Sequence, residues 1–383
     1  MNILLVVPDT VMGGITSAAI NFCNEMVNRG HGVTFLNMSV SDPPHGLDKR
    51  VRVERLHGVE AFWNITATQK QGLPWLVHKS LGFLKKLTIR SGCWYNLIFR
   101  KTKNRITYDL AIAFRQCAPC YFYVLKRINA KAKMGFVHGE LTYMGDISSW
   151  QKYMSSFDKI AYVSDAVRKQ FVSKYPDLDK NACTVYNMFS SQKIIEMSEL
   201  PSDIKIDPQK KCIVTVARVD NNFKQIQWIV DICARLKVEN VPCFHWYVVG
   251  GGPDYEDTVR LSIEKKVDDV LTFLGDQSNP FSIVKQADFT VLTSKSEAYP
   301  MTVIESFILK KPLIVSEFPA IGEMMEHGKH GLIARQSVES LVQCVRQFLE
   351  NQDGIYSTCA NYLEQYLFSN DTPYHQLITA LEK

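Results

Sequence analysis

Short apolar runs alternate with longer amphipathic stretches along the whole chain. The runs are continuous and rich in Val and Ile, which is typical of parallel strands buried on both faces, and the stretches between them have helical spacing. In the first half the pattern predicts strands at residues 2–9, 32–39, 109–114, 133–139, 159–165 and 183–188, with helices such as 17–29 and 166–174 between them. In the second half it predicts strands at residues 211–218, 243–250, 270–276, 289–294, 312–317 and 331–335. This alternation indicates an α/β chain with a doubly wound parallel sheet in each half.

A polar stretch at residues 190–211 separates the two halves, and we interpret it as an interdomain linker. A chain of 383 residues also exceeds what one hydrophobic core usually supports. We therefore expect a first Rossmann-like domain at residues 1–195 and a second at residues 205–365. Residues 366–383 have the pattern of a helix, and the sequence does not show which domain this helix packs on.

The composition is that of a globular protein, with 46% hydrophobic and 22% charged residues. No apolar run approaches the ~18 residues that cross a bilayer, and the start of the chain leads into a Gly-Gly loop rather than a cleavage site. We therefore expect a cytoplasmic protein that is neither secreted nor membrane-spanning. Most of the ten cysteines lie in apolar segments, as free thiols of a reduced compartment do. Cys117 and Cys120 form a C-x-x-C pair, which we interpret as two buried structural thiols because a zinc site normally needs a second pair.

Two glutamates flank the start of a predicted helix in the second half. A strand ends near Ser294, Glu297 lies in the following loop, Pro300 suits the first position of a helix, and Glu305 lies inside that helix. The unpaired N–H groups at Met301 and Thr302, which follow Pro300, and the positive end of the helix dipole form a site for a diphosphate. Glu305 could accept two hydrogen bonds from the vicinal diol of a ribose. By spacing alone, a solvated loop and a surface helix explain the two carboxylates equally well.

Two cations follow another predicted strand of the same half. Arg218 comes directly after the strand and Lys224 stands before the next helix. Both could reach one anion at the carboxyl edge of the sheet, where open parallel sheets bind ligands. An Arg fork and a Lys charge can stabilise a phosphate leaving group without a metal, so the pair points to phosphate-leaving chemistry.

The segment SEAYPMTVIE, with its E-x7-E spacing, resembles the family 4 retaining glycosyltransferases, which have the GT-B fold of two facing Rossmann-like domains with a cleft between them. Other blocks resemble that family in the same order along nearly the whole chain: VMGGITSAAINFCNEMVNRGHGVTF, VHG, KIAYVSDAVRKQF, TVYNM, VARVDNNFK, WYVVGGGP, VLTFLGDQSNP and GEMMEHGKHGLIA. The ordered series is more specific than any single motif. One departure is Ala298, which stands where the family commonly has Gly after the first Glu, and it leaves the identity of the donor sugar open.

The resemblance implies a hexosyl transfer with retention of configuration from a nucleotide-diphosphate sugar, with a UDP-sugar favoured over GDP-mannose. Glu297 and His138 would be the catalytic residues, Glu297 near the donor sugar and His138 facing the sugar or acceptor across the cleft. The donor-binding residues it implies are Gly13, Gly14, Arg218, Lys224, Gly250, Gly251, Gly275, Asp276, Pro300, Met301, Thr302 and Glu305. A structural histidine at 138 and a purely structural turn at Gly250 to Gly252 are the alternatives.

We expect neither a metal nor another cofactor. The acidic D-x-D triplet at Asp177 to Asp179 lies between a predicted helix and a predicted strand, and we interpret it as a solvated loop. The sequence has no His/Cys cluster at zinc spacing. Stabilisation of the leaving group and positioning of the reactants would therefore carry most of the catalysis.

Residues 62–105 combine basic and aromatic side chains. Nine Lys and Arg residues and no acidic residue lie between Glu60 and Asp109, whereas the net charge of the whole chain is only +5. Aromatic residues and leucines interleave with these cations, which is typical of a helix on an anionic lipid surface; a solvated helical face over an ordinary core is the alternative. In the resembling family the first domain receives the acceptor. We therefore expect a saccharide or polyprenyl-linked acceptor and peripheral attachment to the inner face of the cell membrane, during assembly of lipopolysaccharide, capsule or another surface polysaccharide.

Three other functions compete with this interpretation. An NAD-dependent oxidoreductase is disfavoured because the first strand leads into PDTVMGGITSA rather than G-x-G-x-x-G. A nucleotide-sugar epimerase of the same fold is nearer, and it would need no acceptor. A basic membrane- or nucleic-acid-binding module would leave the donor residues unexplained, and since no recognised nucleic-acid motif accompanies the basic stretch, we expect no nucleic-acid partner.

Overall fold

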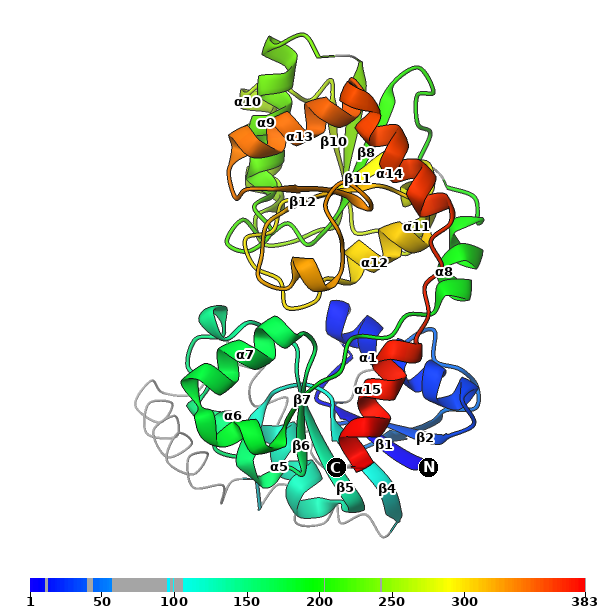
Figure 1. The fold of residues 1–383 in the computed structure, drawn as a ribbon, viewed down its shortest axis with the longest axis vertical. Helices are drawn as coiled ribbons and strands as arrows, with labels where there is room; N and C mark the ends of the chain where they lie inside the picture. The colour runs from blue at the N-terminus through cyan, green and yellow to red at the C-terminus, as the bar shows by residue number, and fades with distance from the viewer. Residues whose placement is uncertain are drawn as a thin grey trace, which may run out of the picture. The chain divides into compact units, whose positions relative to one another are not determined.

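The structure is a computed structural model, and it describes residues 1–10, 13–39, 44–56, 95, 96, 99, 106–202, 204–241 and 243–382. The chain divides into two compact units (Figure 1). Unit 1 comprises Met1–Phe189 and Asn370–Lys383, and unit 2 comprises Ser190–Ser369. Each unit has an α/β fold with its own parallel sheet, as the hydrophobic pattern predicts.

Unit 1 is built on a seven-stranded parallel sheet with the order β3-β2-β1-β4-β5-β6-β7. The strands are β1 (Asn2–Val7), β2 (Gly32–Asn37), β3 (Arg52–Arg55), β4 (Thr107–Ala113), β5 (Asn129–Val137), β6 (Lys159–Tyr162) and β7 (Ala182–Thr184). The helices are α1 (Gly14–Asn28), α5 (Ala118–Arg127), α6 (Ser148–Gln151), α7 (Asp165–Lys174) and α15 (Asp371–Glu382), with short 3-10 turns η1 (Leu141–Tyr143), η2 (Met154–Ser156) and η3 (Pro176–Asn181). The side chains of residues 3–6 in β1 are fully buried, because both faces of the central strands are covered.

Unit 2 is built on a six-stranded parallel sheet with the order β10-β9-β8-β11-β12-β13. The strands are β8 (Lys211–Val216), β9 (Phe244–Val249), β10 (Leu271–Gly275), β11 (Phe289–Leu292), β12 (Leu313–Ser316) and β13 (Gly331–Ala334). The helices are α8 (Ser191–Ser198), α9 (Ile226–Val238), α10 (Tyr255–Glu264), α11 (Phe281–Val284), α12 (Met301–Ile308), α13 (Val338–Leu349) and α14 (Ile355–Glu364), with 3-10 turns η4 (Ile321–Glu323) and η5 (Gln352–Gly354). Its core joins Ile213 and Trp246 of the sheet to Leu236 of α9 and Val345 of α13.

The strand order reverses once in each sheet, and this reversal positions the candidate site. In unit 1 the reversal lies between β1 and β4, and in unit 2 it lies between β8 and β11. Loops that leave neighbouring strands at such a point diverge to opposite faces of the sheet, which leaves a crevice at the carboxyl edge. The residues that follow β8 and β11 are therefore the first place to look for a ligand site in unit 2.

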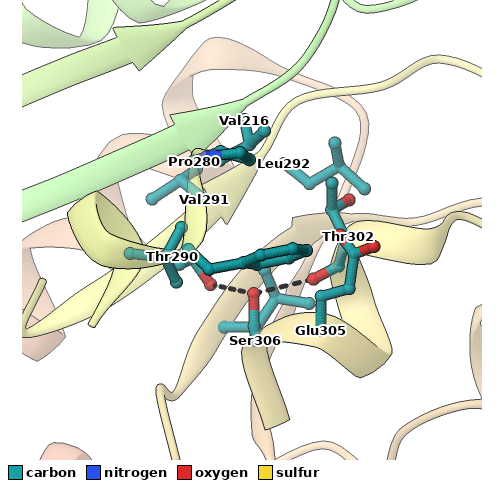
Figure 2. Close-up of a pocket in the computed structure, with 11 residues that line it drawn as sticks. Val216, Pro280, Thr290, Val291, Leu292, Thr302, Glu305 and Ser306 are labelled. Carbon is teal, nitrogen blue, oxygen red and sulfur yellow. Dashed lines mark hydrogen bonds between the residues drawn. The ribbon is translucent and has the colours of Figure 1, made fainter. Parts of the chain in front are cut away.

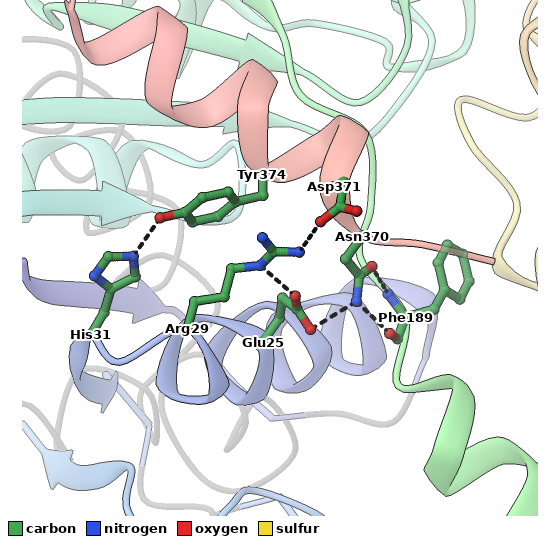
Figure 3. A network of polar contacts seen from close by, with 7 residues as sticks. All are labelled: Glu25, Arg29, His31, Phe189, Asn370, Asp371 and Tyr374. Atoms are coloured by element: carbon green, nitrogen blue, oxygen red, sulfur yellow. Dashed lines mark hydrogen bonds and ion pairs between the residues drawn. The ribbon is translucent and has the colours of Figure 1, made fainter.

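The chain leaves unit 1 and returns to it at one point, which Figure 3 shows in close-up. The N–H of Phe189 donates to Asn370 Oδ1 (2.9 Å), and the Asn370 amide donates to the Phe189 carbonyl (2.8 Å) and to Glu25 (2.9 Å). Arg29, which directly follows α1, joins Glu25 (2.6 Å) to Asp371 at the start of α15 (2.8 Å). The last helix, whose packing the sequence leaves open, is thus held on unit 1.

Some boundaries differ from the expected ones. The stretch interpreted as a linker contains α8, which contacts α11 and α12 and belongs to unit 2. The strand expected at 183–188 is only Ala182–Thr184, and β3 was not expected from the sequence at all. Because β3 is a short edge strand with mostly exposed side chains, it carries little hydrophobic signal. Most of the basic segment at 62–105 lies outside the described residues. Within the part that is described, the helices are too short or too polar to span a membrane.

Candidate functional site

Arg218, Lys224 and Glu297 come together at the carboxyl edge of the unit 2 sheet. Arg218 and Lys224 follow β8, and Glu297 follows β11, which pairs with β8 in the sheet. The Lys224 ammonium forms an ion pair with the Glu297 carboxylate, and the Arg218 guanidinium forms one with Asp220. The Lys224 and Glu297 side chains are 26% and 12% exposed, whereas the Arg218 side chain is 66% exposed. Lys224 is therefore held in place by Glu297, and the largely exposed Arg218 side chain is held at one point by Asp220.

The backbone at Lys224 is fixed by a strained turn. Gln225, the residue immediately before α9, has the left-handed angles φ 53° and ψ 39°, which are uncommon outside glycine. The buried Thr293 hydroxyl donates to the Lys224 carbonyl (2.7 Å), and the Lys224 N–H donates to the Asp220 carbonyl (2.7 Å). These bonds hold the turn in a conformation that directs the lysine toward the β11 loop.

Glu297 is held from its own loop as well. The hydroxyl of the fully buried Ser294 donates to Glu297 Oε1 (2.7 Å), and Ser316 of β12 donates in turn to the Ser294 carbonyl (2.5 Å). The carboxylate therefore accepts hydrogen bonds from Lys224 and from Ser294 on one oxygen. A lysine has three donor hydrogens, so Lys224 can keep this bond and still bind a phosphate oxygen.

Glu305 lies apart from this ion pair, in a cavity between α11, α12 and the sheet (Figure 2). The cavity is lined mainly by apolar side chains such as Val216, Phe281 and Leu292. Burial in this surrounding raises the pKa of Glu305 to about 7. The neighbouring Ser306 is occupied, since it accepts from Thr290 (2.9 Å) and donates to the backbone of the preceding turn. Among the described residues, no side chain donates to the Glu305 carboxylate, so its hydrogen-bonding capacity is open to a ligand.

The amino end of α12 lies between Glu297 and Glu305. Pro300 precedes the helix in an extended conformation, and its ring offers no atom that could accept from the helix N–H groups. Met301 is buried and Thr302 is partly exposed at the first two helical positions. The start of an eight-residue helix without a capping side chain favours an anion.

The glycines at 250–252 hold the Arg218 loop against the end of β9. A Cβ at Gly250 would lie 2.2 Å from the Ala217 carbonyl oxygen, and one at Gly252 would lie 2.2 Å from the Val219 carbonyl oxygen. The Val219 N–H donates to the Gly251 carbonyl (2.8 Å) across the same contact. These glycines are needed for close backbone approach, and this structural role positions Arg218.

Gly275 and Asp276 brace the same turn from β10. Gly275 has a left-handed φ of 65°, and its carbonyl accepts from Gly250 (2.8 Å). The Asp276 carboxylate accepts from the Gly251 N–H (2.7 Å). These contacts are all within the protein, so a contact of Gly275 or Asp276 with a nucleotide base stays a prediction.

The remaining candidates, Gly13, Gly14 and His138, lie in unit 1. Gly13 precedes α1, and Gly14 is its first residue, at the carboxyl end of β1. A Cβ built at Gly13 meets no atom within 4 Å, so packing within unit 1 does not require a glycine there. His138 directly follows β5, and its N–H donates to Gln116 (3.1 Å) in the loop after β4.

The His138 ring is buried against aromatic side chains. Its centroid lies 4.7 Å from that of Phe114 and 5.7 Å from that of Phe136. Burial lowers the pKa of His138 to about 3, and the nearby Arg115 adds to the effect, although a hydrogen bond with the Phe114 backbone opposes it. Nε2 is buried and has no hydrogen-bond partner, so the structural histidine alternative leaves one nitrogen unexplained.

The acidic triplet at Asp177 to Asp179 lies in η3 of unit 1, where Asp179 is 3.7 Å from Arg168. In the portion of the chain that the structure describes, no three His, Cys, Asp or Glu side chains gather closely enough to hold a metal ion.

The sequence does not single out three polar residues that support the site: Asp220, Thr293 and Ser294. All three are buried at the ends of the strands that carry Arg218 and Glu297. Their position in the sequence could have indicated them, because a buried polar residue at the end of a buried strand normally has a hydrogen-bond partner. Their partners became visible only once β8 and β11 were seen to be neighbours.

Comparison with known proteins agrees with this geometry. Residues 210–351 match the protein-family model described as glycosyl transferases group 1. This match covers β8 through α13, and with them Arg218, Lys224, Glu297 and Glu305. The chain has the GT-B fold, and part of its second half matches the model for glycosyl transferases group 1.

The solved structures that share this GT-B fold match over the full chain. TarM of S. aureus, solved in complex with fondaparinux, alpha-GlcNAc-glycerol and UDP, matches with a TM-score of 0.70 at 13% identity, covering 100% of both chains. Anabaena Alr3699/HepE, solved in complex with UDP and glucose, matches with a TM-score of 0.72 at 15% identity, again covering 100% of both chains. At these identities the likeness shows the fold.

Among curated relatives, N-acetyl-alpha-D-glucosaminyl L-malate synthase of Bacillus anthracis is 22% identical over 224 residues. The match covers 56% of this chain and 58% of that protein, so the chain spans little more than half the length of the relative in the alignment. The activity of this chain therefore has to be argued from its own site.

Proposed function

We propose that the protein is a glycosyltransferase that moves a hexosyl unit from a nucleotide-diphosphate sugar to a saccharide or lipid-linked saccharide, with retention of configuration. The observation that carries the proposal is the Lys224–Glu297 ion pair at the carboxyl edge of the unit 2 sheet, with Arg218 after the same strand as Lys224 and Glu305 inside α12. Two cations, a helix amino end and a carboxylate in an apolar cavity together match a diphosphate joined to a ribose.

Each residue has a distinct task in this proposal. The Glu305 carboxylate accepts hydrogen bonds from the ribose hydroxyls. Arg218 and Lys224 neutralise the negative charge that grows on the departing phosphate oxygen as the bond to the anomeric carbon breaks. Because Lys224 is held by Glu297, the site needs little rearrangement before the leaving group is stabilised. Glu297 itself faces the hydroxyl groups of the donor sugar.

UDP is the favoured nucleotide. TarM and Alr3699/HepE, which share the fold over the full chain, were both solved with UDP. The apolar cavity beside Glu305 offers few polar groups that could select a base. Retention of configuration and membership of glycosyltransferase family 4 rest on the Glu297–Glu305 spacing.

A thermal-shift panel tests the donor site. UDP, GDP, ADP and their sugars are added without metal to the wild type and to an Arg218→Ala, Lys224→Ala double variant. A ligand at a hundredfold excess over its Kd stabilises a protein by about 2.7 kcal/mol. We expect stabilisation of the wild type by UDP and its loss in the double variant.

The matched control is a Lys237→Ala, Lys265→Ala double variant. These lysines form surface ion pairs with Asp269 and Asp231, away from the site, and the control should keep the full nucleotide shift. A wild type that is folded and yet unaffected by every nucleotide would contradict the proposal. Isomerisation of the donor sugar without an added acceptor would instead identify an epimerase.

The acceptor and the membrane surface form a separate part of the proposal. Its support is the basic and aromatic composition of residues 62–105, most of which lie outside the described residues. Attachment to anionic lipid at the inner face of the membrane would bring a polyprenyl-linked acceptor to the enzyme. Vesicle sedimentation at low salt tests this: the protein should partition onto anionic vesicles, and equal partitioning onto neutral vesicles would refute the membrane attachment.

A further inference from the structure

The C-x-x-C pair of unit 1 lies at a helix start. Cys117 is the residue immediately before α5, and Cys120 is the third residue of that helix, so the sequence between the thiols is Ala-Pro. Cys117 is half-buried and Cys120 is fully buried. A strand, β4, ends only a few residues earlier, at Ala113. A helix start that follows a strand, with one accessible and one buried thiol three residues apart, is the arrangement of a dithiol that can close on itself.

The two thiols have different surroundings. The thiol and the N–H of Cys120 face the Cys117 sulfur and lower the pKa of Cys117, and the nearby Arg115 guanidinium lowers it further, although burial and Asp9 oppose this. Burial raises the pKa of Cys120, and so does its neighbour Cys117. Cys120 Sγ also lies 3.5 Å from the Met38 sulfur. The amino end of a helix favours a thiolate at the position that Cys117 occupies.

We propose that Cys117 and Cys120 form a redox-active dithiol that exchanges with low-molecular-weight disulfides. The Cys117 thiolate attacks one sulfur of the small disulfide, forms a mixed disulfide and releases one small thiolate. Cys120 then loses its proton to solvent and attacks the Cys117 sulfur, which closes the internal disulfide and releases the second small thiol. Overall, the protein loses two electrons and two protons, and one disulfide is reduced to two thiols.

The proposal replaces the interpretation of this pair as two structural thiols. A structural cysteine is buried and inert, and Cys23 and Cys233, which are fully buried in their helices, fit that description. Cys117 differs from them, because it is partly exposed and its pKa is shifted downward rather than upward. Pro119 lacks an N–H, and it fixes the first turn of α5 between the two thiols.

The pair lies beside a loop that the transfer reaction could use. Gln116, the residue before Cys117, accepts from the His138 N–H (3.1 Å). A Cβ at Gly139 would lie 3.5 Å from the Gln116 amide nitrogen, so the Gln116 side chain packs against the backbone after β5. The redox-active dithiol is nevertheless a property of the thiols alone, and its test needs no sugar substrate.

Peptide mapping after exchange with glutathione tests the proposal. Trypsin cleaves after Arg115 and after Lys126, and the peptide between them contains Cys117 and Cys120 and no other cysteine. The reduced full-length protein is incubated with glutathione disulfide at pH 7, quenched with acid and alkylated. In the wild type we expect this peptide to lose two hydrogens and to carry no lasting glutathione. In a Cys120→Ser variant we expect glutathione to remain on Cys117.

The exposed Cys243 of unit 2 serves as the internal reference. Cys117 in the Cys120→Ser variant should acquire glutathione at least about tenfold faster than Cys243, and this difference should vanish in urea, where the helix start is lost. A Cys243→Ser variant should form the internal disulfide like the wild type, and a thermal melt of each variant establishes that it is folded. Equal rates at Cys117 and Cys243 in the folded protein, or lasting glutathione on wild-type Cys117, would overturn the proposal.

Discussion

Replacement of Glu305 by Gln separates the stability of unit 2 from its ligand binding. The folded protein holds the carboxyl proton more tightly than the unfolded chain does, because burial raises the pKa from 4.5 to about 7. The contribution of this protonated carboxyl group to the stability of unit 2 is therefore complete below pH 4.5, and it is lost as the pH rises from 4.5 through 7. At 1.36 kcal/mol per pKa unit, the loss is about 3 kcal/mol. Glu305→Gln keeps the shape of the side chain and removes this dependence.

Thermal unfolding between pH 5 and pH 8 measures the effect. For a unit of this size, 1 kcal/mol corresponds to about 2–4 °C in Tm, so Glu305→Gln should melt roughly 6–12 °C above the wild type at pH 8. The difference should shrink toward pH 5, where the wild-type carboxyl group is protonated. Glu256→Gln, at an exposed position of α10, is the control and should follow the wild type.

Nucleotide binding should favour the ionised carboxylate, whereas the stability of unit 2 favours the protonated form. A ribose diol donates to the ionised carboxylate, so UDP should bind the wild type more tightly as the pH rises through 7, and it should bind Glu305→Gln weakly at every pH. A Tm difference between the wild type and Glu305→Gln that stays constant from pH 5 to pH 8 would refute the burial argument. A pH-dependent Tm difference together with unchanged UDP binding would keep the burial argument and remove Glu305 from the donor site.

Three further predictions concern other parts of the chain. Gly252→Ala should lower the stability of unit 2 by about 3 kcal/mol, because its Cβ would clash with backbone, whereas Gly13→Ala should leave the Tm unchanged; equal melting of the two variants would contradict this. His138, whose pKa is lowered to about 3, should stay neutral from pH 5 to pH 8, and a histidine NMR titration with a midpoint near 6.5 would contradict it. Asn370→Ala should cost unit 1 about 1–3 kcal/mol in urea unfolding, because the Asn370 amide bridges two segments, while the more exposed Asp371→Ala should cost less than about 1 kcal/mol; similar losses would contradict the bridging role.

The sequence predicts the parallel strands of both units well, because a strand buried on two faces needs a continuous apolar run. The prediction from sequence fails for elements that are not buried on both faces. The edge strand β3 has exposed side chains, and its pairing with β2 comes from the backbone alone. Helix α8 was interpreted as a linker because its apolar face is small, with Ile194 buried and Ile195 exposed.

The candidate site shows a similar division. Three helices and three strands, from α9 to β11, separate Lys224 from Glu297 along the chain, and only the pairing of β8 with β11 makes the two residues neighbours. The resemblance to a known family supplied that proximity. The roles of the supporting partners Asp220, Thr293 and Ser294 could not be predicted, since a buried hydrogen bond is defined by two positions at once and the sequence shows each alone.

Glycines illustrate why one residue type in a motif can have two meanings. Gly250 and Gly252 are required by the fold, because a Cβ at either position would meet a carbonyl oxygen of the Arg218 loop at 2.2 Å. Gly13 lies in a loop that looks equally characteristic in sequence, yet a Cβ there meets nothing within 4 Å. If Gly13 is needed, the reason must therefore be a molecule that the loop approaches, and not the packing of unit 1. Stability and ligand affinity measured on the same glycine variants separate these two meanings, because a fold glycine changes both and a ligand glycine changes only the affinity.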